Sequence, residues 1–313
     1  MELCPPEKDS GGFFMSRTEN NILLFSVTVC WAASHVFLKS LPSDLSTYAY
    51  LTMTCGIAAV LMTVVFFKKM IKTKFAAFLK SAILAGLLFL ILLFEKIGIG
   101  TVASSTASVL ISSSIIIVPV MLIIMKKMPT KNNLLGAIVI MAGIVITSGF
   151  SVENILSRGA LFLLLTAVVY SVYTIIANKI TKEEDPLIIS AWQMWITALL
   201  GFIMWFIEKP TTFASLEYTN EMLSSIFMLA FFGKAYAYAA LMYAQKYSTP
   251  INVTIMASTE PIVTLVLAVL IPSAYEEHFT TAAVVGAVVI MIGAIISGTD
   301  FLSRKGGKRL EVK

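Results

Sequence analysis

Long apolar segments separated by short polar turns run along most of this 313-residue chain. A helix needs about 20 mostly apolar residues to cross the core of a bilayer. Ten segments meet this requirement: residues 20–40, 46–67, 76–96, 102–125, 133–150, 158–179, 187–207, 222–245, 250–271 and 281–299. Their apolar positions do not alternate as they do in barrel strands. The pattern therefore predicts an all-α integral membrane protein with ten transmembrane helices.

One apolar pattern occurs twice. The stretch "GAIVIMAGIVITS" (136–148) returns as "GAVVIMIGAIISG" (286–298), and the glycines in each copy are seven residues apart. Residues at this spacing share a helix face, where small side chains let two backbones approach closely. Each copy ends a set of five predicted helices, which indicates two five-helix repeats at 20–150 and 151–299. Because five is odd, the second repeat must be inverted relative to the first.

The charges of the connections set the expected orientation. With the N-terminus inside, eighteen lysines and arginines lie in cytoplasmic segments and four lie outside. Basic residues favour the cytoplasmic side, so we expect both tails, 1–19 and 300–313, in the cytoplasm and the protein in the cell (inner) membrane. We expect the basic tail 300–313 to lie near anionic lipid and expect no nucleic-acid partner.

Composition excludes several classes of protein. Hydrophobic residues make up 58% and charged residues 13%, with a mean hydropathy of +0.88, which leaves too little polar surface for a soluble globule. The three cysteines are scattered and only two histidines occur. The sequence has no phosphate-binding glycine loop and no paired nucleophile and base at membrane depth. We therefore expect no enzyme activity, no cofactor and no metal site.

Two segments in the second half carry a family resemblance. In "KYSTPINVTIMASTEPIVTLVLAVL" (246–270), a Tyr-Ser-Thr start, a run of small residues and the pair Glu260-Pro261 follow the ninth-helix motif of EamA-type drug/metabolite transporters. The stretch "VVYSVYTIIANK" (168–179) resembles the sixth helix of that family, with Tyr170 where a tryptophan is usual.

The first half resembles the same family. The stretch "TVASSTASVLISSSIIIVP" (101–119) is similar to its fourth helix, and "WAASHVFLK" (31–39) is similar to its first. Trp31, Ser34 and Lys39 match, whereas His35 replaces a common asparagine. The resemblance implies ten helices in two halves and the transport of a small molecule. It does not choose among amino acids, nucleosides, drugs and other metabolites.

Two ionisable residues fall at membrane depth, where such groups are costly and mark functional sites. Lys234 and Glu260 each lie about 20 Å along a helix from the turn near residues 247–248. They form a structural ion pair, or Lys234 binds a substrate carboxylate or phosphate while Glu260 takes up a proton. Glu95 and Lys96 are expected at the outer interface.

Further residues are candidates for binding substrate or protons. His35 either relays protons or makes a structural hydrogen bond. Trp31, Tyr170 and Tyr173 are candidate pocket aromatics. A face of the fourth helix with Ser104, Ser105, Ser108 and Ser112 either lines a polar path or packs against a neighbour.

Two prolines are candidate helix kinks. Pro261 follows Glu260, and Pro119 occupies the fourth helix. Proline removes a helix hydrogen bond, which bends the helix and frees a carbonyl. The alternative is that both prolines are simply tolerated, as prolines often are in membrane helices.

We therefore expect a monomeric secondary transporter. It exports or exchanges a small polar metabolite, such as an amino acid or related organic anion, by alternating access in the bilayer, with protons as the candidate coupling ion. The alternative is a non-transporting membrane protein, such as a lipid-handling or regulatory subunit. A sealed core that packs Lys234 and Glu260 away from any cavity would favour this alternative.

Overall fold

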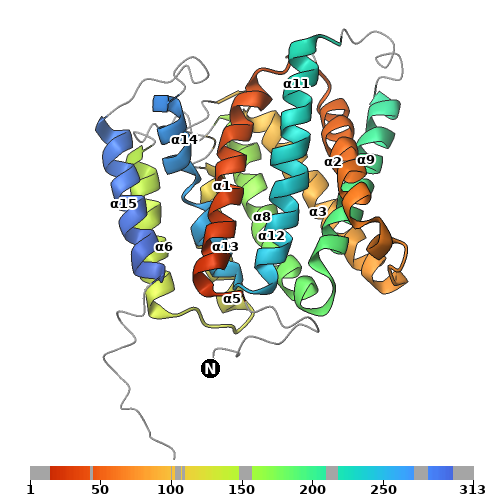
Figure 1. The fold of residues 1–313 in the computed structure, drawn as a ribbon. Coiled ribbons are helices and arrows are strands. Elements are labelled where there is room, and N and C mark those ends of the chain that lie inside the picture. The colour runs from red at the N-terminus through yellow and green to blue at the C-terminus, as the bar shows by residue number, and fades with distance from the viewer. Residues whose placement is uncertain are drawn as a thin grey trace, which may run out of the picture.

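The protein is helical throughout the part of the chain that its computed structural model describes (Figure 1). The described residues are 15–42, 45–99, 101–102, 107, 110–147, 157–208, 218–270 and 281–298. The expected tails, 1–19 and 300–313, fall largely outside these ranges, as do Ser104, Ser105 and Ser108.

The helices follow the predicted order. Their bounds are α1 (Arg17–Lys39), α2 (Thr47–Met70), α3 (Phe75–Ile99), α5 (Ser114–Ile124), α6 (Lys131–Thr147), α8 (Arg158–Glu183), α9 (Pro186–Glu208), α11 (Asn220–Met228), η1 (Leu229–Tyr236), α12 (Ala237–Lys246), α13 (Pro250–Ala257), α14 (Glu260–Leu270) and α15 (Thr281–Gly298).

These elements account for the ten predicted helices. Elements α11, η1 and α12 form one continuous eighth helix, whereas α13 and α14 form a ninth helix that is interrupted at Ser258–Thr259. Five helices of the described chain are long and apolar enough to cross a membrane: α2, α3, α8, α9 and the eighth helix. The prediction of an all-helical membrane protein is confirmed.

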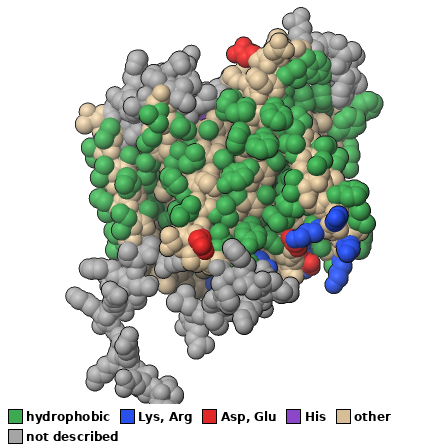
Figure 2. Space-filling model, in the orientation of Figure 1, with side chains coloured by type: hydrophobic (Ala, Val, Ile, Leu, Met, Phe, Trp, Pro, Cys, Tyr) green, Lys and Arg blue, Asp and Glu red, His purple; other side chains and the backbone are tan. Residues whose placement is uncertain are grey.

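The flank of the bundle is apolar. Val64, Ile124 and Phe75 expose 76%, 75% and 73% of their surface, which would be unfavourable in water but suits contact with lipid. Hydrophobic side chains cover the flank in Figure 2, and lysine or arginine side chains gather at its lower rim. This distribution is typical of a protein that spans a bilayer.

The doubled glycine pattern packs against itself. Helices α6 and α15, which carry the two copies, lie side by side at one edge of the bundle (Figure 1). A Cβ added to Gly143 would lie 2.7 Å from the backbone nitrogen of Ile290, and one added to Gly293 would lie 2.7 Å from that of Ile140. Only glycine allows this approach, so the repeated stretch has a packing role.

The first three helices of each repeat pack against the first three helices of the other repeat. Helix α3 packs on α8 and α12 packs on α1, so the third helix of each repeat contacts the first helix of the other. Helices α2 and α9, the second of each repeat, also pack together. Such exchange of partners is what a two-fold relation between two similar halves produces.

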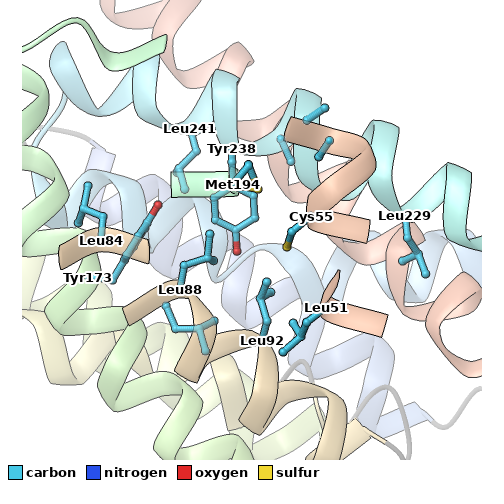
Figure 3. Packing of buried hydrophobic residues seen from close by; sticks show 14 of the residues in the cluster. Leu51, Cys55, Leu84, Leu88, Leu92, Tyr173, Met194, Leu229, Tyr238 and Leu241 are labelled. Atoms are coloured by element: carbon cyan, nitrogen blue, oxygen red, sulfur yellow. The ribbon is translucent and has the colours of Figure 1, made fainter. Parts of the chain in front are cut away.

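A buried apolar cluster joins α2, α3, α8, α9 and α12. Leu84, Leu88 and Leu92 recur every four residues along α3 and so share one face. Around them gather Leu51 and Met194, from α2 and α9, together with tyrosines from α8 and α12 (Figure 3). The cluster lies directly beside the polar cavity described next.

Candidate functional site

A cavity of about 50 Å³ lies between the two repeats. Side chains from α1, α2, α3, the fourth helix, α8, η1, α12, α13 and α14 surround it. They are Trp31, Ser34, His35, Tyr50, Ile91, Glu95, Ile111, Ser112, Ser114, Thr166, Tyr170, Lys234, Tyr238, Ala257 and Glu260. Four of these side chains are acidic or basic, which is a high density of charge for the interior of a membrane protein.

His35 and Glu260 form a close polar contact in this cavity. The Nε2 atom of His35 lies 3.1 Å from Oε1 of Glu260 and 3.9 Å from Oε1 of Glu95. The side chains of His35 and Glu260 expose 2% and 6% of their surface, whereas that of Glu95 exposes 21%. Glu260 Oε1 makes no well-directed hydrogen bond to any described residue, so this contact is close without hydrogen-bond geometry.

The interruption of the ninth helix places Glu260. Helix α13 ends at Ala257, two turn residues follow, and α14 begins at Glu260 with Pro261 next. Proline is well suited to the start of a helix because its missing N–H would have no partner there. The chain thus restarts a helix at the carboxylate that faces the cavity.

Pro119 lies inside its helix, whereas Pro261 lies at the start of α14. Pro119 is buried inside α5, whereas the turn that interrupts the fourth helix lies at Ser113. The two interruptions approach each other, since Ser258 Oγ donates a hydrogen bond of 3.3 Å to the carbonyl of Ser112.

Lys234 enters the cavity from a π-helical segment. It occupies η1 and is 5% exposed, and its Nζ lies 5.9 Å from the ring centres of both Tyr50 and Tyr238. These distances are within the range of cation–π attraction. A π-turn inside an α-helix is rare and is frequent at functional sites.

Gly233 lets this segment approach α1. A Cβ at this position would lie 2.5 Å from Oγ of Ser34, the neighbour of His35. The close contact therefore brings Lys234 and His35 to the same cavity from different repeats.

Lys234 and Glu260 both line the cavity, but no ion pair joins them within 4.0 Å in the described structure. The electrostatic neighbours of Lys234 are instead Tyr50 and Glu95. The direct pairing that the sequence allowed is therefore not formed, and Glu260 contacts His35 instead.

Aromatic rings form one wall. Trp31 lies edge-on to Tyr170, with ring centres 5.9 Å apart, and 5.8 Å from Tyr238. Tyr173 does not line the cavity: it packs behind Tyr170 and Tyr238, and its hydroxyl donates a hydrogen bond of 3.1 Å to Gln193 Oε1. Of the three aromatic candidates from the sequence, Trp31 and Tyr170 thus reach the cavity.

Two buried hydroxyls in the cavity have unused hydrogen-bonding capacity. Tyr170 Oη and Ser112 Oγ make no well-formed hydrogen bond to any described residue, although Thr174 lies near Tyr170. Buried polar atoms are normally satisfied, so such atoms are suited to binding water or a ligand.

Glu95 is the main cavity residue that sequence analysis did not propose as a site residue. Its position at the outer interface stays a prediction, but the structure shows that α3 continues to Ile99 and that Glu95 lines the cavity. Leu84, Leu88 and Leu92 lie on the buried face of α3, and Glu95, three residues after Leu92 and seven after Leu88, falls on the same helix face. This periodicity could have identified it.

Three ion pairs join the repeats away from the cavity, near the C-terminal end of α2 and the N-terminal end of α3. Lys80 Nζ lies 2.8 Å from Glu183 Oε2 and 2.7 Å from Glu184 Oε1, and Lys69 Nζ lies 2.9 Å from Asp185 Oδ2. All three acids belong to the end of α8 or the connection to α9. We call Lys69, Lys80, Glu183, Glu184 and Asp185 the ionic cluster.

No group of three potential metal ligands occurs among the described residues. The cavity lining combines acidic and basic side chains, aromatic rings and hydroxyls.

The sequence model of the EamA-like transporter family matches residues 20–149 and 157–299, which is most of the chain and covers both halves. The chain belongs to the EamA-like transporter family. Solved structures agree with this EamA-like fold: 29 chains match, among them a crystal structure described only as that of a protein. It superposes with a TM-score of 0.74 at 15% identity, over 93% of this EamA-like chain and 100% of its own. Comparison with curated proteins finds no match.

Proposed function

We propose that this EamA-like transporter exports or exchanges a small polar metabolite, such as an amino acid or a related organic anion, by alternating access. One observation carries the proposal. A buried cavity between the repeats presents a lysine, two glutamates and a histidine beside a wall of aromatic rings. Substrate sites of secondary transporters lie where the repeats meet, near the midplane.

The residue types fit a polar metabolite. The ammonium of Lys234 suits a carboxylate, the carboxylate of Glu95 suits an amine, and Trp31 with Tyr170 offers a flat apolar surface. The free hydroxyls of Tyr170 and Ser112 add hydrogen-bonding capacity. Chemically mixed pockets of this kind are typical of small-molecule sites.

The cavity is too small for a metabolite in this conformation, so the proposal requires the repeats to move. About 50 Å³ holds only a few water molecules, since each needs roughly 10–15 Å³. A metabolite therefore requires the repeats to separate around the charged residues. The ionic cluster joins the repeats at the end that the charge distribution assigns to the cytoplasm, so we interpret this conformation as closed on that side.

The setting of the transporter belongs to the same proposal. We place it in the cell (inner) membrane as a monomer, with both termini in the cytoplasm and protons as the coupling ion. The alternative of a lipid-handling or regulatory membrane protein predicted a sealed core. A cavity lined by Lys234 and Glu260 supports transport instead.

A counterflow assay tests the proposal. Liposomes that contain the purified protein are preloaded with a mixture of unlabelled amino acids, organic acids and nucleosides and then diluted into trace amounts of each labelled compound. Accumulation of at least one labelled compound above empty liposomes is the expected result. Equal counts in both preparations for every compound would refute exchange transport of these metabolites.

A further inference from the structure

A groove of about 540 Å³ lies at the surface, between the α2–α3 hairpin of the first repeat and α9 of the second. Aromatic rings dominate its lining, which includes Phe67, Phe75, Phe78, Trp192 and Trp195. The other described residues that line it are two threonines, a methionine and an isoleucine, so none is charged. It shares no lining residue with the charged cavity, and its volume falls within the about 300–1,000 Å³ that is usual for small-molecule sites.

The hydrogen-bond donors of the groove are already used. Trp195 Nε1 donates a hydrogen bond of 2.8 Å to Thr63 Oγ1, and Trp192 Nε1 donates one of 3.0 Å to Thr73 Oγ1. The two threonine hydroxyls in turn donate to backbone carbonyls of α2, at 2.7 Å and 2.6 Å. An indole or a hydroxyl has a single donor hydrogen, so these side chains have none left for a ligand. The groove is therefore suited to an apolar occupant.

The groove is open to the surroundings of the bundle. Phe67, Ile71 and Phe75 are exposed, so an acyl chain can enter between them from the bilayer. Within the groove, Phe78 lies edge-on to Trp192, with ring centres 5.2 Å apart. These two packed rings join α3 to α9, so an occupant contacts both repeats at once.

Two exposed lysines border this apolar surface. Lys72 and Lys74 stand on either side of the lining residue Thr73, in the connection between α2 and α3. Neither has a carboxylate within 4.0 Å in the described parts of the chain, whereas the lysines of the ionic cluster are paired with acids. The connection lies at the lower right in Figure 1, where basic side chains gather in Figure 2. Both ammonium groups are therefore available to an anion.

An anionic phospholipid fits both parts of this surface. Its acyl chains need apolar contacts, and its phosphate is attracted to lysines beside a membrane helix. Tryptophan and lysine are also typical of the membrane–water interface, where a phosphate meets its acyl chains. A second copy of this chain fits less well, because a symmetric dimer through the same face would bring the exposed lysines of both chains together.

We propose that the groove binds an acyl chain of an anionic phospholipid whose phosphate lies at Lys72 and Lys74. The lipid packs against α2 and α3 on one side and against α9 on the other. The site lies outside the charged cavity and does not depend on the proposed transport.

Native mass spectrometry of the detergent-solubilised protein tests the role of the lysines. The probes are phosphatidylglycerol and phosphatidylcholine with identical acyl chains. We expect a preference for phosphatidylglycerol that falls about ten-fold or more in Lys72→Gln with Lys74→Gln and persists when both are changed to arginine. The matched control is Lys127→Gln with Lys131→Gln, which removes two exposed lysines outside the groove and should keep the preference. An equal loss in both glutamine pairs would overturn the site.

Tryptophan fluorescence tests the acyl chain. Bromine atoms on the acyl chain of phosphatidylglycerol quench nearby indoles, so the quenched fraction should fall in Trp195→Phe. It should not fall in Trp205→Phe, because Trp205 is only 3% exposed and lies outside the groove. Brominated phosphatidylcholine at the same mole fraction should quench Trp195 less.

Inorganic phosphate, which has no acyl chain, should not displace the brominated lipid. Displacement by phosphate, equal quenching by both brominated lipids, or a dimer without quenching of Trp195 would overturn the inference.

Discussion

The Nε2 atom of His35 in α1 lies 3.1 Å from Oε1 of Glu260 in α14, so a buried contact joins the first repeat to the second. It forms where the ninth helix restarts after Ser258–Thr259. Movement of one repeat relative to the other would change the distance between these two side chains. The contact is therefore a natural place for ligand or proton binding to influence conformation.

The two tyrosines of α8 should have separable effects. Tyr170→Phe removes a hydroxyl that faces the cavity, so we expect weaker ligand binding with little change in stability. Tyr173→Phe leaves Gln193 Oε1 without its donor, so we expect a loss of about 1 kcal/mol in stability and unchanged affinity. Thermal unfolding in detergent and counterflow KM distinguish them. Equal effects of both changes on KM would contradict the assignment of Tyr170 to the cavity.

The glycine contacts between α6 and α15 predict a stability effect. Gly143→Ala places a Cβ 2.7 Å from a backbone nitrogen of α15, which cannot move without shifting the helix. We expect a loss of about 1–3 kcal/mol, seen as a lower unfolding temperature in detergent.

Gly86→Ala is the matched control, because a Cβ there meets nothing within 4 Å. It should leave the unfolding temperature unchanged or slightly raise it, since alanine favours helix more than glycine does. A Gly143→Ala protein as stable as Gly86→Ala would show that α6 and α15 do not pack as described.

The ionic cluster predicts a charge-swap effect on transport. Lys80→Glu places three acids together, which should separate the repeats at that end and lower the exchange rate several-fold. Exposed ion pairs contribute at most about 1 kcal/mol to stability, so the unfolding temperature should change little.

Restoring opposite charges provides the control. Glu183→Lys together with Glu184→Lys should recover much of the exchange rate in the Lys80→Glu background. Failure of this reversal, with all proteins folded, would mean that the ionic cluster does not take part in closure.

The fold was largely predictable because its determinants are local. Ten apolar segments and a repeated glycine spacing are properties of sequence windows, and both correspond to the described helices. The glycine face predicted close helix packing, but the sequence did not predict that the two copies, in α6 and α15, contact each other. The exact repeat boundaries, 20–150 and 151–299, remain predictions.

The sequence predicted which ionisable residues share a region of the bundle, but it did not predict their contacts. The cost of burying charge drew attention to Lys234 and Glu260, and both line the cavity together with His35, another candidate from the sequence. That they bind substrate or protons stays a prediction. Distance along a helix fixes depth, whereas the direction of a side chain depends on helix rotation. The π-turn at Lys234 and the interruption before Glu260 change that rotation locally, so the contact of Glu260 with His35 could not be read from spacing.

The most direct test of transport through this cavity is exchange in liposomes that carry Glu260→Gln, Lys234→Ala or the control Glu208→Gln. Glu260→Gln removes the carboxylate beside His35, and Lys234→Ala removes the buried ammonium of the cavity, so the exchange rate should fall about ten-fold or more, whereas the control, an acid at the exposed end of α9, should match the unaltered protein. Unchanged exchange in both cavity variants, with the proteins folded and inserted, would contradict the account.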